Sequence, residues 1–244
     1  MFSLMKDRRI VALGDSLTEG RYLSDKDGIK ISPYTVSLKQ RIDQYLQDHE
    51  NPFSVDVENV SRGGLFVGPE GLWSEYEPKE WDRPSIYIRQ ISMKSPDACI
   101  ILAGSTNLGM IGYPINFGEV KIEDPEIENK IDELVRNLFS LYQTLTEASI
   151  IPISLTIPSV SKDDKRQFYQ KLRYVVNEKI IVYSREHNIP YVDLSTATMD
   201  SDGWMLPEYC SKDGGHFNPK GYEKMAEVIF EQGVKPLLEK WMQK

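Results

Sequence analysis

Three side chains that lie far apart in the sequence could together form a proton relay. Ser16 lies in the segment Gly-Asp-Ser-Leu-Thr-Glu-Gly at 14–20, and Asp213 and His216 lie three positions apart across two glycines near the carboxyl end. A serine hydroxyl is a weak nucleophile, so a catalytic serine needs a base that removes its proton and a third group that orients this base. A turn that lays the Asp213 carboxylate against the His216 imidazole would supply both groups.

Each of these residues also has an ordinary structural interpretation. Ser16 alone is compatible with a helix cap, and an isolated His–Asp pair is more often a surface hydrogen bond. Neither phosphate-binding pattern, Gly-x-x-x-x-Gly-Lys-Ser/Thr or Gly-x-Gly-x-x-Gly, occurs in the chain. The nucleophile-elbow pattern Gly-x-Ser-x-Gly also fails, because position 18 is threonine. The other two histidines, His49 and His187, lie in no motif that indicates catalysis or metal binding, and we expect them at the surface.

The periodicity of apolar residues predicts strands and helices that alternate from end to end. This alternation is typical of a parallel sheet with helices on both faces. Right-handed crossovers favour the five-stranded order 2-1-3-4-5, which is a flavodoxin-like three-layer α/β/α sandwich. The predicted strands cover 8–13, 53–60, 97–102, 149–157 and 191–194, and the predicted helices cover 33–49, 127–147, 162–187 and 219–242.

The predicted sheet also tells us where a site should lie. In doubly wound sheets, ligands bind beyond the carboxyl ends of the strands, where the strand order reverses. Ser16 follows the first predicted strand, and the pair formed by Asp213 and His216 lies in the loop after the fifth. This rule points to the residues directly after the first, second and third strands as candidates for a site.

The two motifs in these positions resemble the SGNH (GDSL-type) hydrolase family of esterases and lipases. Gly-Asp-Ser-Leu follows the first strand, and Asp-x-x-His precedes the last helix within Gly-His-Phe-Asn-Pro-x-Gly-Tyr at 215–222. The resemblance covers nearly the whole chain and implies the SGNH hydrolase fold. It also implies that Ser16 is the nucleophile, His216 the base and Asp213 the acid. Asp193, near the end of the fifth strand, is a rival acid, but the short spacing to the histidine favours Asp213.

The resemblance further implies an oxyanion hole, to which the Ser16 N–H and a glycine N–H contribute. The glycine should lie in Asn-Val-Ser-Arg-Gly-Gly at 59–64, at the end of the second strand. Counting from the asparagine favours Gly64, with Gly63 as the alternative. A glycine suits this role because no Cβ atom blocks the approach of its N–H to the substrate oxygen.

The third oxyanion donor lies where the chain departs from the family pattern. Members commonly show Gly-x-Asn-Asp after the third strand, whereas this chain reads Ala-Gly-Ser-Thr-Asn-Leu-Gly at 103–109. Asn107 is the asparagine in reach, so we assign it as the donor. If the register follows the Leu-Gly pair instead, Thr106 occupies the donor position and Asn107 replaces the aspartate.

These residues together predict a serine esterase or lipase-type hydrolase. We expect it to cleave a carboxylic ester, namely an acyl or acetyl ester of a small molecule, a carbohydrate or a lipid, through an acyl-enzyme on Ser16. The chemistry requires no cofactor or metal, and the chain has three histidines and no Cys-x-x-C pattern. The segment at 103–109 departs from the family pattern, so an alternative stays open. In this alternative, the chain is a catalytically impaired ligand-binding protein with the SGNH fold. Acyl-chain length, oxygen ester against thioester, and oligomeric state also stay open.

Composition argues against several other classes of protein. The chain of 244 residues has 29 Lys+Arg against 37 Asp+Glu, a net charge of −8, which argues against a nucleic-acid-binding protein. The absence of an apolar run near ~18 residues argues against an integral membrane protein. The first residues carry their charges after a short apolar patch, whereas a secretory signal has its charges before a longer apolar stretch. The two cysteines, Cys99 and Cys210, are interpreted as reduced thiols. We therefore expect a cytoplasmic protein.

Domain organisation follows from the same features. The length and the uniform composition predict a single domain over 1–244. The segment 65–95 interrupts the alternation with five aromatic residues, three prolines and no clear period. We expect it to be an aromatic-rich insertion near the active site.

Overall fold

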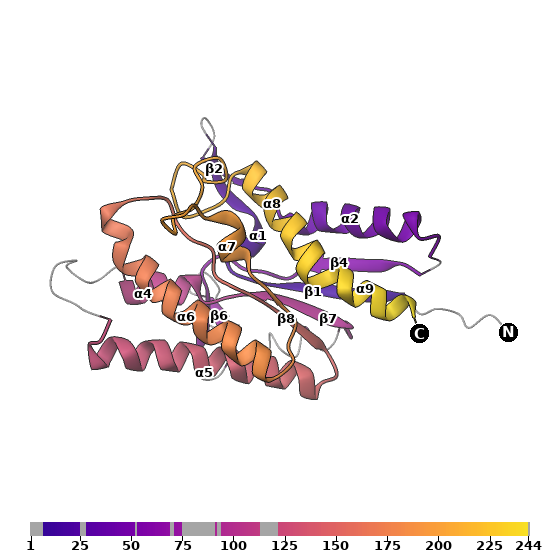
Figure 1. Cartoon of the computed structure of the whole chain (residues 1–244), viewed down its shortest axis with the longest axis horizontal. Coiled ribbons are helices and arrows are strands. Elements are labelled where there is room, and N and C mark those ends of the chain that lie inside the picture. The colour runs from indigo at the N-terminus through magenta and orange to yellow at the C-terminus, as the bar shows by residue number, and fades with distance from the viewer. Residues whose placement is uncertain are drawn as a thin grey trace.

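The chain is described by a computed structural model over residues 7–24, 28–51, 53–68, 71–74, 91, 94–112 and 122–243. A five-stranded sheet in the order β4-β1-β7-β8-β9 forms its centre (Figure 1). All neighbouring strands in it are parallel, and their order along the chain is 2-1-3-4-5, as predicted. The strands are β1 (Arg8–Gly14), β4 (Val55–Asn59), β7 (Ala98–Leu102), β8 (Ile151–Leu155) and β9 (Tyr191–Val192).

Helices cover both faces of this sheet (Figure 1). In β1, Ile10 and Ala12 join the apolar cluster under one group of helices, whereas Val11 and Leu13 join the cluster under the other group. Because its side chains alternate between two apolar layers, the strand reads as a continuous apolar run. One layer holds α2 (Tyr34–Asp48), α8 (Pro219–Ile229) and α9 (Lys235–Met242), and the other holds α4 (Ser105–Gly112), α5 (Pro125–Glu147) and α6 (Gln167–Glu186).

Helix α8 begins where its sequence requires it to begin. Asn218 caps the helix, since its side chain accepts a hydrogen bond from the Gly221 N–H at 2.9 Å. Pro219 follows in the first turn, where its missing N–H has no intrahelical partner to lose. The turn at 211–216 lies just before this cap.

Prolines affect two of the predicted elements, a helix that is interrupted and a strand that forms. The single helix predicted over 219–242 is interrupted by a π-helical segment at Phe230–Val234. Pro236 lies just beyond it, and a proline inside a helix removes a hydrogen bond and crowds the preceding turn. Pro152 is tolerated in β8 because the pairing with β9 starts only at Ser154, so no neighbouring strand requires its N–H.

Short hairpins accompany the sheet and were not predicted. One joins β2 (Arg21–Ser24) to β3 (Gly28–Ile31), and another joins β5 (Leu65–Gly68) to β6 (Gly71–Ser74). The second hairpin forms the beginning of the predicted insertion at 65–95, most of which lies outside the described residues.

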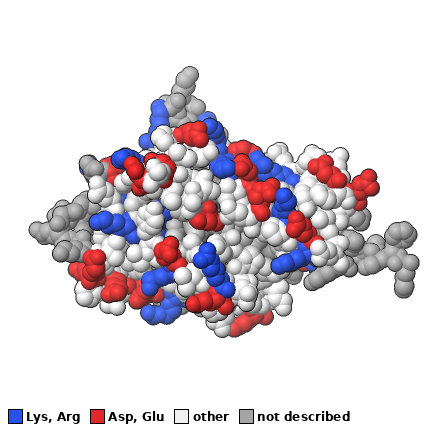
Figure 2. All heavy atoms as spheres, viewed as in Figure 1, with Lys and Arg blue, Asp and Glu red and all other residues white. Residues whose placement is uncertain are grey.

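Charged side chains of both signs are interspersed on the face shown in Figure 2. In the described part of the chain, no helix is both long enough and apolar enough to cross a membrane.

Candidate active site

The candidate nucleophile lies at the first residue of a short helix, α1 (Ser16–Glu19), which directly follows β1. The Asp15 side chain caps this helix by accepting the Leu17 N–H at 3.0 Å. The tight passage from strand to helix requires Gly14, because a Cβ atom there would lie 2.2 Å from the Leu102 carbonyl oxygen. Ser16 is thereby placed at the carboxyl end of β1.

Asp15 also joins this loop to the start of α4. Its carboxylate accepts a hydrogen bond from the Ser105 hydroxyl and another from the Thr106 N–H. Burial raises the pKa of Asp15, and the bonds from Ser105 and Leu17 act in the opposite direction. Ser105 was not predicted from the sequence, where its only signal is its place directly after Gly104.

The Asp213 carboxylate is held within its own turn. One oxygen, Oδ1, accepts hydrogen bonds from the Ser211 hydroxyl at 2.6 Å, the Gly215 N–H at 2.9 Å and the His216 N–H at 3.0 Å. The other, Oδ2, lies 2.5 Å from His216 Nδ1. Burial would raise the pKa of Asp213, but the bonds from His216 and Ser211 outweigh it and hold the pKa below its usual range. Ser211 was also missed, although it lies two residues before the acid.

The structure brings the three predicted residues together. Ser16 Oγ lies 2.7 Å from His216 Nε2, although 200 positions separate the two residues in the sequence. With Asp213 ionised, the Nδ1 atom donates to Oδ2, which leaves Nε2 as the acceptor of the serine proton. The arrangement is therefore a continuous line from carboxylate to imidazole to hydroxyl.

Asp193, the rival acid, has a different role. It caps α7 (Leu194–Thr198), accepting the Thr196 N–H at 3.1 Å, and it accepts the Thr156 hydroxyl at 3.1 Å. His216 pairs with Asp213 instead.

Gly64 lies in a turn that is fastened to the end of β1. The Arg62 N–H donates to the Gly14 carbonyl at 2.9 Å, and the Leu65 N–H donates to the Arg62 carbonyl at 3.2 Å. Gly64 adopts a φ of 69°, in the left-handed region that favours glycine. Within the described part of the chain, its N–H has no hydrogen-bond partner. At the alternative position, Gly63, a Cβ atom would lie 2.9 Å from the Glu19 carboxylate and the Arg21 guanidinium.

Asn107, on α4, forms hydrogen bonds with the hairpin that follows Gly64. Its Nδ2 atom donates to the Val67 carbonyl at 2.9 Å, and its Oδ1 atom accepts the Val67 N–H at 3.0 Å. An amide nitrogen has two hydrogens, so one N–H remains beyond this pair. Thr106, the alternative donor, uses its backbone N–H on Asp15.

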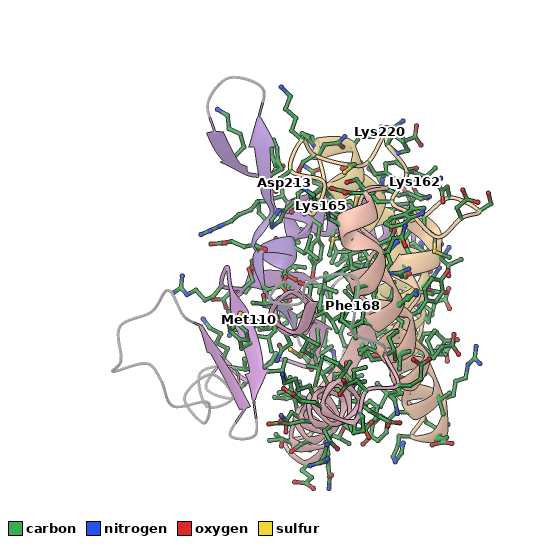
Figure 3. All side chains as sticks on the ribbon, turned by 90° about the vertical axis from the view of Figure 1, so that its left-hand side faces the viewer. Met110, Lys162, Lys165, Phe168, Asp213 and Lys220 are labelled. Carbon is green, nitrogen blue, oxygen red and sulfur yellow. The ribbon has the colours of Figure 1, made fainter. Side chains whose placement is uncertain are left out.

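Two cavities adjoin these loops, and Figure 3 shows this side of the molecule, with Met110 below Asp213. One, of about 250 Å³, has Asn107 in its wall; the apolar residues that line it are Phe66, Val67, Met110, Ile111 and Leu134. The other, of about 400 Å³, includes Ser211 in its wall; further lining residues are Ser161, Lys162, Trp204, Met205 and Cys210. Among the described residues, no group of three or more His, Cys, Asp or Glu side chains could hold a metal ion.

Comparisons with known proteins agree on the fold and the family. The model of the GDSL-like Lipase/Acylhydrolase family matches residues 12–224. No curated protein sequence matches the chain significantly. Among solved structures, a lipase/acylhydrolase from Enterococcus faecalis is 21% identical with a TM-score of 0.62, and the match covers 91% of this chain and 93% of that one.

Two further solved structures give the same picture. A GDSL-like lipase from Bacteroides thetaiotaomicron is 18% identical with a TM-score of 0.56, over 96% of this chain and 88% of that one. An acetylxylan esterase from Geobacillus stearothermophilus is 16% identical with a TM-score of 0.62, over 92% and 93%. At these identities the structural likeness establishes the common fold.

Proposed function

Because the chain belongs to the GDSL-like lipase/acylhydrolase family, whose members are hydrolases acting on esters, we propose that it hydrolyses a carboxylic ester through an acyl-enzyme on Ser16. The observation that carries this proposal is the line of contacts from Asp213 through His216 to Ser16, with heavy-atom separations of 2.5 and 2.7 Å. Both separations lie within the range in which a base can take a proton from a nucleophile.

The reaction follows from the roles of these three groups. Ser16 Oγ attacks the ester carbonyl as His216 Nε2 removes its proton, and His216 then protonates the leaving alcohol. Water repeats the sequence on the acyl-enzyme, which releases the acid and restores the serine. Asp213 fixes the imidazole tautomer and stabilises the imidazolium that forms, and its lowered pKa keeps it ionised for this purpose.

The tetrahedral oxyanion is stabilised by the N–H groups of Ser16 and Gly64. Two observations support this role for Gly64, namely its position beside the end of β1 and the lack of a partner for its N–H among the described residues. Asn107 contributes the N–H that its pairing with Val67 leaves over. Losing one donor of this kind typically lowers turnover by roughly 10²–10³.

The substrate is an acyl or acetyl ester of a small molecule, a carbohydrate or a lipid. The cavity bordered by Asn107 has apolar side chains in its wall, which suits an acyl group. The cavity bordered by Ser211 combines Trp204 with polar side chains, which suits a hydroxylated alcohol. The fold shared with an acetylxylan esterase fits the acetyl ester of a carbohydrate.

The direct test is covalent labelling with a fluorophosphonate, detected by intact mass. The wild-type protein should gain one adduct, the Ser16→Ala variant none, and Ser140→Ala, which changes an exposed serine on α5, should label like the wild type. An equal adduct on wild type and Ser16→Ala would exclude Ser16 as the nucleophile. A series of p-nitrophenyl esters of increasing chain length then defines the acyl group.

A second candidate is a ligand-binding protein with impaired turnover. The pairing of Asn107 with Val67 favours it, because this pairing commits part of an expected oxyanion donor to the backbone. A folded wild-type protein that neither hydrolyses any ester of the series nor forms an adduct would support this candidate over the hydrolase.

A further inference from the structure

Arg166, which directly precedes α6, reaches the main chain of the turn that carries the acid. Its Nη2 atom donates to the Asp213 carbonyl oxygen at 2.5 Å, and its Nη1 atom donates to the Ser161 hydroxyl at 3.2 Å. The side chain is only 22% exposed, and Asp163 lies 3.8 Å from its Nε atom. A guanidinium that donates in two directions from a partly buried position is a strong and directional contact.

A second bond fastens the same two segments. The Ser161 N–H donates to the Gly214 carbonyl at 2.8 Å, next to the carbonyl that Arg166 holds. Residues 161–166 therefore form a strap along the outer side of the turn at 211–216. In Figure 3, Lys165 of this strap is seen beside Asp213.

The close fit of strap and turn leaves no room for a side chain between them. Gly214 has a φ of 70°, and a Cβ atom on it would lie 2.2 Å from Ser161 Oγ and 2.4 Å from Arg166 Nη1. Glycine is thus required at this position both by the backbone conformation and by the approach of the strap.

The strap matters because the turn cannot set its own position. The bonds to the Asp213 carboxylate come from Ser211, Gly215 and His216, which all belong to the turn, so they shape the turn internally. Ser16 lies on a separate loop after β1. The bonds from Ser161 and Arg166 come from outside the turn and restrain where it lies.

We propose that Arg166 is a positioning residue that holds the Asp213–His216 pair at the distance from Ser16 that proton transfer requires. This proposal rests on the proposed hydrolase function. Arg166 acts through the main chain of the acid, and it touches neither the reacting atoms nor the carboxylate. A displacement of about 1 Å in such a pair can lower a rate by about 10²-fold, which sets the size of the expected effect.

The test compares Arg166→Ala and Arg166→Lys with a matched control, Lys165→Ala. Lys165 is the exposed neighbour in the same strap, so its removal leaves the turn unchanged. We expect Arg166→Ala to lower kcat by about 10²-fold with little change in KM, Arg166→Lys to lower it less, and Lys165→Ala to match the wild type. Free guanidinium, well below denaturing concentrations, should restore part of the activity of Arg166→Ala and none to Ser16→Ala.

A proton NMR measurement separates positioning from a loss of folding. The strongly deshielded proton between His216 Nδ1 and Asp213 Oδ2 should be seen in the wild type and should broaden or shift in Arg166→Ala at a temperature where both are folded. Gly214→Ala should have the same effect, because the added Cβ atom on the turn pushes Ser161 and Arg166 of the strap away. An Arg166→Ala variant with unchanged kcat and an unchanged proton resonance would overturn the proposal.

The two proposals fail in different ways. If the wild type hydrolyses no ester and forms no adduct, the hydrolase function fails, yet the proton resonance still shows whether Arg166 orders the pair. If the wild type is active and Arg166→Ala equals it in both measurements, only the positioning role fails.

Discussion

The side-chain amide of Asn107 pairs with the backbone of Val67 in both directions, donating at 2.9 Å and accepting at 3.0 Å. An asparagine bound in this way acts like one more residue at the edge of strand β5. It links helix α4 to the hairpin that begins just after Gly64, so two walls of the candidate oxyanion hole are held together by one side chain.

This pairing makes the effect of Asn107→Ala specific. We expect the variant to lose about 1–3 kcal/mol of unfolding free energy, because the Val67 groups lose their partners. If the remaining N–H serves the oxyanion, kcat should also fall by roughly 10²–10³ while KM changes little. Urea denaturation and steady-state kinetics measure the two effects. Thr106→Val is the comparison, and a larger loss of kcat in it than in Asn107→Ala would assign the donor to Thr106.

A substitution at Gly64 should affect both stability, through backbone strain, and catalysis, through the oxyanion donor, and a second glycine separates the two effects. Gly64→Ala places a Cβ atom at a φ of 69°, which costs about 1–2 kcal/mol and turns the N–H away from its present direction. We expect a lower unfolding free energy and a lower kcat. Gly203→Ala is the matched control, because Gly203 has a φ of 86° and its Cβ would meet only the flexible end of Tyr174. It should lose stability and keep its kcat, and equal losses of kcat in both variants would argue against an oxyanion role for Gly64.

The Asp213 carboxylate should make stability depend on pH. Its folded-state pKa is lowered, so relative to an unfolded value near ~3.9 it stabilises the protein above that pH. This contribution is lost as the pH falls toward the folded-state pKa. The difference in unfolding free energy between wild type and Asp213→Asn should therefore shrink between pH ~5 and ~3. Chemical denaturation at several pH values measures it, and a constant difference would contradict the cause assigned here.

The sheet and the relay could be predicted because each leaves a local signal. Strand β7 (Ala98–Leu102) is buried along its whole length, so its apolar run is visible without a structure. Asp213 and His216 lie in one short turn, so their spacing alone indicates contact. The family resemblance then connected that turn with Ser16, which no local pattern could have done.

Features that depend on distant contacts could not be predicted. The pairing of Asn107 with Val67 joins residues 40 positions apart through one backbone unit, and that contact has no counterpart in the motif. Arg166 contacts a carbonyl oxygen 47 positions away, and any residue could supply that carbonyl. The hairpins at β2–β3 and β5–β6 are too short to show a clear period, so tertiary packing decides them.

Arg173 is a fully buried arginine on α6, and its hydrogen-bond partners among the described residues are neutral. Its guanidinium donates to the Ser195 hydroxyl, to Gln170 Oε1 at 2.8 Å and to the Gly203 carbonyl at 3.4 Å. Burial lowers its pKa, since the charged form loses its water. These bonds fasten the loop at 199–205 to the same helix whose start carries Arg166.

We expect Arg173→Met, which keeps most of the volume, to lower the unfolding free energy by about 2–3 kcal/mol, because it leaves buried oxygens without a donor. Arg185→Met changes an exposed arginine on the same helix, bonded to the Tyr191 hydroxyl, and should cost less than about 1 kcal/mol. Urea denaturation followed by circular dichroism measures both. An Arg173→Met variant as stable as the wild type would show that desolvation of the guanidinium cancels its hydrogen bonds, and that the loop is held by its apolar contacts instead.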